Sequence, residues 1–174
     1  THKDRYALKL ASELNIKYYA ISFVNSHKDL EEVKKIIGNN KFIISKIETK
    51  NAIFNLNKIT KNSDALLIDR GDLSRYVPIE KIPIAQESII KQSIKLNTPT
   101  YVATNLLESM IKENEATRAE SHDIYSTLKK GAEGLVLAAE TAIGKNPIEC
   151  VRFIKRCLAV YKKNKNKKNT KKYL

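Results

Sequence analysis

The sequence contains no apolar run of the roughly 18 residues that a membrane-spanning helix needs, and its first residues do not form a signal-peptide pattern. We therefore expect a soluble protein of the cytoplasm, with an organelle as the alternative compartment. Cysteine is scarce as well. Cys150 and Cys157 stand seven positions apart on one predicted helix, about 10 Å along its axis, which is too far for a disulfide. Because CxxC and HxxxH spacings are absent, we expect buried thiols and no zinc site.

Positive charge, by contrast, is abundant and unevenly placed. The chain has 32 lysines and arginines against 19 acidic residues, a formal net charge of +13. Seven lysines fall in the last thirteen residues, and subtracting them leaves +6 for the rest. A Lys/Asn run cannot bury enough apolar surface to offset the entropy lost on ordering, so we predict a disordered tail over 163–174. Few aromatic side chains accompany these lysines, so we do not expect a nucleic-acid partner.

Residues 1–162 are predicted to form one α/β domain in which apolar strands alternate with helices. The expected strands are 18–24, 42–48, 65–69, 100–104 and 134–140. Such alternation favours parallel strands joined by right-handed crossovers. About five β/α units can form an incomplete (β/α) barrel of the TIM type or a doubly wound sheet. An incomplete barrel leaves two edge strands, so we expect a homo-oligomer or another association through those edges.

Polar side chains gather where the predicted strands end. The strand at 42–48 finishes in Lys46 and Glu48, which share one surface because side chains in a strand alternate between faces. Asp72 closely follows the next strand, and a later strand ends in Thr104. Parallel sheets with intervening helices collect their chemistry at the carboxyl ends of the strands, so a site is predicted here. The alternative interpretation is a solvated Lys–Glu pair and an aspartate that only caps a turn.

Five short motifs in this chain resemble one known family in their order and near its spacing. They lie at 44–48, 64–73, 103–111, 117–120 and 140–144. Together they resemble pyruvate kinase, with a match that runs from residue 1 to about 160. The resemblance implies that the chain forms the second part of that family's catalytic TIM barrel, its strands four to eight. Five co-linear motifs are far more specific than one, since a lone Arg-Gly-Asp occurs by chance in many chains.

The resemblance implies a reaction and a set of site residues. Pyruvate kinases transfer a phosphoryl group from phosphoenolpyruvate to ADP, giving pyruvate and ATP in glycolysis. Lys46 matches the family's catalytic lysine, and Glu48 and Asp72 match its ligands for Mg²⁺ or Mn²⁺. The backbone N–H groups of Gly71 and Asp72, with the catalytic Thr104 hydroxyl, would hold the substrate carboxylate. Potassium is expected for the family, but the strands that supply its ligands have no counterpart here, so we expect a weak or inactive kinase from this chain alone.

Several positions depart from the family pattern, among them Ser74 and Tyr76, and two departures bear on the chemistry. Asp69 stands where a small residue is usual, and it adds negative charge near the metal end of its strand. Ala138 replaces a serine of the network that protonates the enolate, which argues against that relay and leaves phosphoryl transfer as the expectation. Two other hypotheses stay open. One is metal-dependent enolate chemistry on a 2-oxo acid, and the other is a non-catalytic interaction module with a basic tail.

Overall fold

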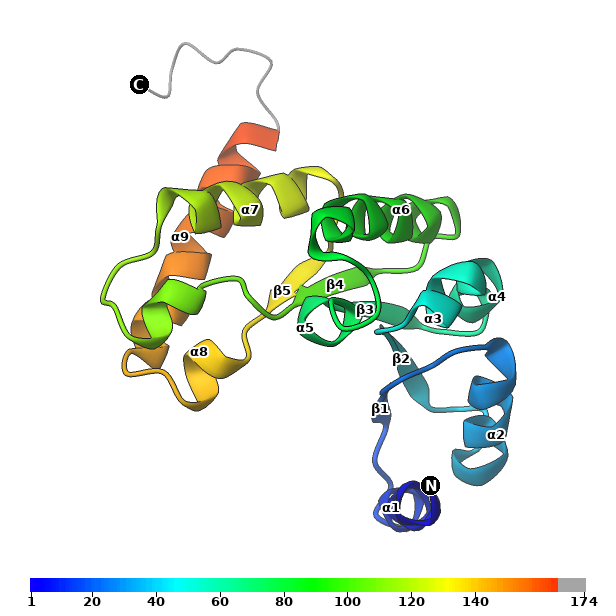
Figure 1. Cartoon of the computed structure of the whole chain (residues 1–174). Coiled ribbons are helices and arrows are strands. Elements are labelled where there is room, and N and C mark those ends of the chain that lie inside the picture. The colour runs from blue at the N-terminus through cyan, green and yellow to red at the C-terminus, as the bar shows by residue number, and fades with distance from the viewer. Residues whose placement is uncertain (166–174) are drawn as a thin grey trace. The chain divides into compact units, whose positions relative to one another are not determined.

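A computed structural model describes residues 1–165 of the chain, which form an α/β fold (Figure 1). Its strands are β1 (Tyr18–Ile21), β2 (Phe42–Ile47), β3 (Ala65–Asp69), β4 (Thr100–Ala103) and β5 (Gly134–Val136). They belong to one five-stranded sheet in the order β1-β2-β3-β4-β5, which is also their order along the chain. This open parallel sheet with alternating helices is the fold of an incomplete barrel, and it confirms the predicted fold class.

Helices and short 3₁₀ turns connect the strands. They are α1 (His2–Glu13), α2 (His27–Ile37), α3 (Lys50–Phe54), α4 (Leu56–Lys61), α5 (Arg70–Leu73), η1 (Ile79–Lys81), α6 (Ile82–Lys95), η2 (Glu108–Ile111), α7 (Arg118–Lys129), α8 (Ala139–Ala142) and α9 (Pro147–Lys165). Capping boxes start α1, α2 and α7, because a Ser or Thr stands three residues before an Asp or Glu at each of them. Among residues 1–165, no helix is both long enough and apolar enough to span a bilayer.

The first and last strands are several residues shorter than the sequence-based expectation, and the strands expected at 42–48 and 100–104 each end one residue early. The first strand stops at Ile21, because the chain turns at Phe23 into a left-handed conformation with φ of +53°. Between β2 and β3, the helical residues form two short helices, α3 and α4, that are separated at Asn55. The strand expected over 134–140 ends at Val136, and α8 follows it. These breaks depend on contacts distant in sequence, which local periodicity does not report.

The described chain consists of two compact units, and each is treated by itself. Unit 1 comprises Thr1–Val102, and unit 2 begins at Ala103. The division of the chain into 1–162 and a tail at 163–174 stays a prediction. Residues 163–165 belong to α9, and the remainder of that predicted tail lies outside the described residues.

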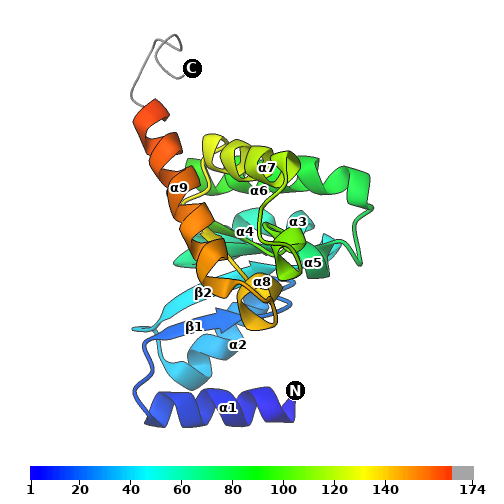
Figure 2. The same cartoon turned by 90° about the vertical axis from the view of Figure 1, so that its left-hand side faces the viewer.

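Unit 1 contains β1, β2 and β3 with the helices that follow them. β2 pairs in parallel with both neighbours, and the register places Ser45 beside Ile21 and Ile47 beside Ile68. Helix α1 contacts α2, α2 contacts α4, and α4 contacts α6. Each helix of this series therefore packs beside the next one in the chain order α1, α2, α4, α6 (Figures 1 and 2). Ile43 and Leu66 are completely buried, as expected where helices cover a parallel sheet.

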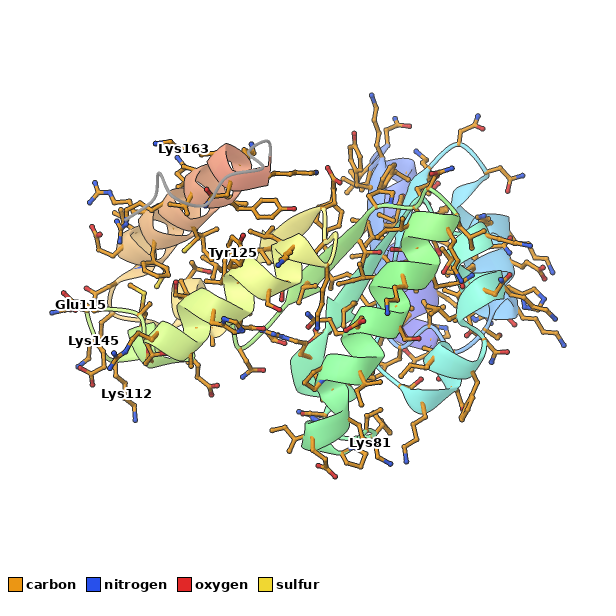
Figure 3. The ribbon with its side chains drawn as sticks, turned by 90° about the horizontal axis from the view of Figure 1, so that it is seen from above. Lys81, Lys112, Glu115, Tyr125, Lys145 and Lys163 are labelled. Carbon is orange, nitrogen blue, oxygen red and sulfur yellow. The ribbon has the colours of Figure 1, made fainter. Side chains whose placement is uncertain are left out.

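Unit 2 is held together by α9, which packs against α7 and α8 (Figure 2). Its core consists of Leu106, Leu107, Met110, Ile124, Leu128, Cys150 and Ile154. On its surface, the rings of Tyr125 and Tyr161 meet edge to face with centroids 5.9 Å apart. Figure 3 shows Tyr125 on α7, and Lys112, Glu115 and Lys145 together at the other end of the unit. Both cysteines are free thiols, but only Cys150 is buried and Cys157 is half-buried.

A buried carboxylate fixes the loops of unit 2. Glu140 is 1% exposed, and its Oε1 accepts hydrogen bonds from the N–H groups of Leu106 (3.1 Å) and Leu107 (3.0 Å). Its Oε2 accepts the N–H of Ala138 at 2.8 Å. Burial of this carboxylate raises its pKa, but hydrogen bonds from Leu107, Ala138 and Leu106 outweigh burial and lower the pKa below the ordinary 4.5.

Glu140→Gln is expected to lower the free energy of unfolding by about 2 kcal/mol at pH 7, because hydrogen bonds to a charged acceptor are replaced by weaker ones. A lowered folded pKa contributes stability that is present above the unfolded pKa of 4.5 and lost as pH falls through the folded value. The difference between wild type and variant should therefore shrink below pH 4.5. Urea unfolding from pH 7 to pH 3 measures it.

The matched control is Glu133→Gln, an exposed glutamate of the same unit. We expect it to change stability by less than about 0.5 kcal/mol at every pH. An equal effect of the two substitutions would contradict an anchoring role for Glu140.

Candidate active site

A lysine and a glutamate lie together at the carboxyl end of β2. Ile43 and Ile47 point into the core, and Lys46 projects from the opposite face, as strand alternation predicts. The Nζ atom of Lys46 lies 2.7 Å from Oε1 of Glu48 and 3.1 Å from Oδ2 of Asp69. The Glu48 side chain is 0% exposed and that of Lys46 is 20% exposed. This is a buried ion pair, which rules out the alternative of a solvated surface pair.

The backbone after β1 completes the surroundings of this pair. The N–H group of Phe23 donates to Oε2 of Glu48, and Nζ of Lys46 donates to the hydroxyl of Ser22 at 3.5 Å. Phe23 is the residue with the left-handed backbone, a conformation that costs energy in a non-glycine residue. Oε1 of Glu48 lies against the Lys46 ammonium, and no other donor among residues 1–165 contacts this oxygen. Glu48 therefore keeps acceptor capacity for a further ligand.

Lys46 is charged at neutral pH in this setting. Partial burial lowers the pKa of its ammonium, but the contacts with Glu48 and Asp69 outweigh burial and raise the pKa above 10.5. A general base must be neutral before it accepts a proton, and this lysine is not. Its chemistry is instead that of a fixed positive charge able to stabilise negative charge on a substrate.

Two further carboxylates lie at the end of β3. Asp69 precedes α5 and accepts the N–H of Asp72 at 3.5 Å, and Asp72 lies 3.5 Å from the largely exposed Arg75. Glu48, Asp69 and Asp72 each offer an oxygen within 4.8 Å of the others. Carboxylate oxygens are the ligands that Mg²⁺ and Mn²⁺ prefer, so this donor set fits such an ion.

The remaining predicted residues are placed as follows. Gly71 lies in α5, beside Asp72, and its carbonyl accepts the Ser74 hydroxyl at 2.7 Å. Lys46, Glu48, Gly71 and Asp72 thus lie in unit 1, at neighbouring strand ends. Thr104 belongs to unit 2, where it has a φ of +69° and donates its hydroxyl to the carbonyl of Ala103 at 2.6 Å. The substrate-binding roles of Gly71, Asp72 and Thr104 stay predictions.

Sequence reasoning missed two contacts of the Lys46–Glu48 pair. It noted Asp69 only as extra negative charge, whereas the β2–β3 register sets Ile47 beside Ile68 and so brings Glu48 next to Asp69. Strand register was the signal that could have found this contact. No sequence signal indicated the Phe23 N–H contact, because every residue except proline has a backbone N–H and the residue type does not show where it donates.

The fold and this cluster define a class of protein, a (β/α)-barrel protein with a cation and carboxylates at the carboxyl ends of its strands. Residues 1–151 match the family model described as "Pyruvate kinase, barrel domain". The chain belongs to the pyruvate kinase family, which confirms the resemblance inferred from the five motifs.

Several curated relatives are similar to the chain. It is 42% identical to "Pyruvate kinase" of Thermotoga maritima over 90% of this chain and 34% of that protein. It is 40% identical to "Pyruvate kinase" of Methanocaldococcus jannaschii over 90% of this chain and 36% of that protein. It is 39% identical to "Pyruvate kinase isozyme G, chloroplastic" of Ricinus communis over 88% of this chain and 38% of that protein. The chain thus spans about a third of the length of these relatives.

Lys46→Met is expected to lower the free energy of unfolding by about 3 kcal/mol in metal-free buffer, because it leaves the buried Glu48 charge unpaired. Lys46→Met/Glu48→Gln should regain much of that loss, since both charges are then gone. Urea unfolding of wild type, Lys46→Met, Glu48→Gln and the double variant gives the coupling energy, which we expect to exceed about 1 kcal/mol. A raised lysine pKa contributes stability that is present below 10.5 and lost only as pH rises through the folded value, so pH 7 is suitable.

The control is Lys91→Met, which removes a lysine 2.6 Å from Glu87 on the surface of α6, where the lysine side chain is 68% exposed. Exposed pairs contribute little, so its effect should stay below about 1 kcal/mol. If Lys46→Met costs no more than Lys91→Met, the pair does not carry the stability assigned to it.

Proposed function

We propose that this chain carries part of a pyruvate kinase active site, one that transfers a phosphoryl group from phosphoenolpyruvate to ADP. The observation that supports this function best is the convergence of Lys46, Glu48 and Asp72 at neighbouring strand ends in a member of the family. Phosphoryl transfer requires positioning of the reactants and stabilisation of charge on the transferred group, and this cluster offers groups for both tasks.

Glu48 and Asp72 would hold Mg²⁺ or Mn²⁺. The buried Oε1 of Glu48 has only the Lys46 ammonium against it among the described residues, which leaves a second lone pair, and the Asp72 side chain is 27% exposed, so both can accept a metal bond. A bound divalent cation supplies a positive charge to the phosphoryl and enolate oxygens. Potassium belongs to the same proposal, with ligands from outside this chain.

Lys46 would place its ammonium beside the phosphoryl group and the developing enolate. Its contacts with Glu48 and Asp69 restrict where that ammonium can lie before substrate arrives, so little reorganisation is needed during the reaction. The N–H groups of Gly71 and Asp72 would bind the substrate carboxylate. A role for the Thr104 hydroxyl in the same task stays the expectation that the family resemblance implies.

Phosphoryl transfer and enolate protonation are separate demands on the site. Ala138 has no hydroxyl, and its N–H is occupied by Glu140 at 2.8 Å, so this residue offers no proton to an enolate. We therefore assign this chain to phosphoryl transfer and assign protonation to a different donor, such as water.

The activity proposed for the chain alone is weak. It spans about a third of its relatives' length, and misplacing even one positioning group lowers rates strongly. Association through the sheet edges, with a second copy or another chain, would supply further groups. Cytoplasmic location is part of the same proposal.

Isothermal titration of the 174-residue chain with Mn²⁺ and then oxalate, a planar analogue of enolpyruvate, tests the proposal. We expect Mn²⁺ binding, followed by oxalate binding that depends on the metal. Glu48→Gln should weaken Mn²⁺ binding at least about tenfold, because even changes to groups that only support a metal ligand cost 10- to 100-fold.

Glu31→Gln is the matched control, since Glu31 is an exposed carboxylate on α2 of the same unit. It should bind Mn²⁺ and oxalate as the wild type does. A folded wild-type chain that binds no Mn²⁺, or a Glu48→Gln variant that binds it unchanged, would refute the proposed site.

A further inference from the structure

Asp69 occupies the middle of the proposed site. Its residue is 8% exposed, at the last position of β3. One carboxylate oxygen, Oδ2, lies 3.1 Å from Nζ of Lys46, and the other, Oδ1, accepts the N–H of Asp72 at 3.5 Å. The same side chain therefore contacts the proposed catalytic ammonium and one of the donors proposed for the substrate carboxylate.

The balance of charge shows what this carboxylate changes. Glu48 and Asp72 carry two negative charges, which one divalent cation can neutralise, and Asp69 adds a third beside them and beside the Lys46 ammonium. Arg75 adds little, because its side chain is 75% exposed and water screens it. With Asp69 present, a bound divalent cation is therefore surrounded by one more negative charge than it would be without Asp69.

We propose that Asp69 sets the ligand preference of this site, strengthening the binding of the divalent cation and weakening the binding of the anionic substrate. The inference rests on the proposed function. The extra carboxylate lies within 4.8 Å of both proposed metal ligands, so it attracts the cation directly. It repels a phosphorylated carboxylic acid by the same Coulomb interaction.

Competition for donors adds to the electrostatic effect. Asp69 already contacts Lys46, which is proposed to lie beside the phosphoryl group and the enolate, and the Asp72 N–H, which is proposed to bind the substrate carboxylate. A substrate must move the Asp69 side chain away from these groups or bind with fewer contacts. Asp69 therefore makes the site favour binding of the divalent cation and disfavour binding of the anionic ligand.

Asp69→Asn tests this inference in the full chain. Asparagine has the size of aspartate and keeps an oxygen that can accept the Asp72 N–H, so α5 retains its cap. Calorimetry with Mn²⁺ alone should show affinity about tenfold lower than wild type. At saturating Mn²⁺, oxalate should bind Asp69→Asn about tenfold more tightly than it binds wild type. A purely structural role cannot move the two affinities in opposite directions.

Asp64→Asn is the matched control. It removes the same charge from the start of β3, where Asp64 accepts the N–H of Ile43 at 2.8 Å. Five residues of strand, about 16 Å, separate it from Asp69, which exceeds the screening length of about 10 Å in 0.1 M salt. Both of its affinities should equal those of wild type, and urea midpoints of all variants verify folding.

The outcomes separate this inference from the proposed function. Opposite shifts in Asp69→Asn, with none in Asp64→Asn, support the assignment. If wild type binds Mn²⁺ and oxalate but Asp69→Asn changes neither, or weakens both, the role of Asp69 is wrong and the site stands. If folded wild type binds no Mn²⁺, the proposed site and the role of Asp69 are both wrong.

Discussion

Burial of the Glu48 carboxylate is the constraint on which the strand ends of unit 1 depend. Removing a carboxylate from water is unfavourable unless charges and donors replace that water. The ammonium of Lys46 and the N–H of Phe23 do so here, and Phe23 adopts a left-handed backbone while donating that N–H. Three consecutive strands are thereby tied together at their carboxyl ends, where a barrel of this kind carries its chemistry.

Two buried glutamates in this chain differ in the groups that surround their carboxylates. Glu140 accepts three backbone N–H groups, so both of its oxygens are in use and its role is to hold loops. Glu48 has fewer donors, because Oε2 accepts one backbone N–H, from Phe23, and Oε1 lies 2.7 Å from the Lys46 ammonium. Burial alone does not distinguish them, and the number of donors does.

Much of unit 1 followed from local sequence rules. Strand alternation placed Lys46 and Glu48 on one face, and Ser or Thr before acidic residues marked helix starts. The contact of Asp69 with Lys46 required the register between two strands, which depends on packing across the sheet. The short helix at Ala139–Ala142 was missed because Glu140 folds inward to reach backbone donors more than thirty residues earlier in the chain. Patterns in a short stretch of sequence do not reveal contacts between residues that are far apart in the chain.

The central claim is that this chain presents a metal-binding site formed by Glu48 and Asp72 beside Lys46. The most direct measurement is anomalous X-ray scattering from crystals soaked in Mn²⁺. The account predicts a manganese peak bonded to carboxylate oxygens of both residues, at about 2.0 to 2.2 Å, the range for small divalent ions in oxygen sites. A manganese peak only at surface carboxylates, with the Glu48 and Asp72 oxygens unliganded, would contradict it.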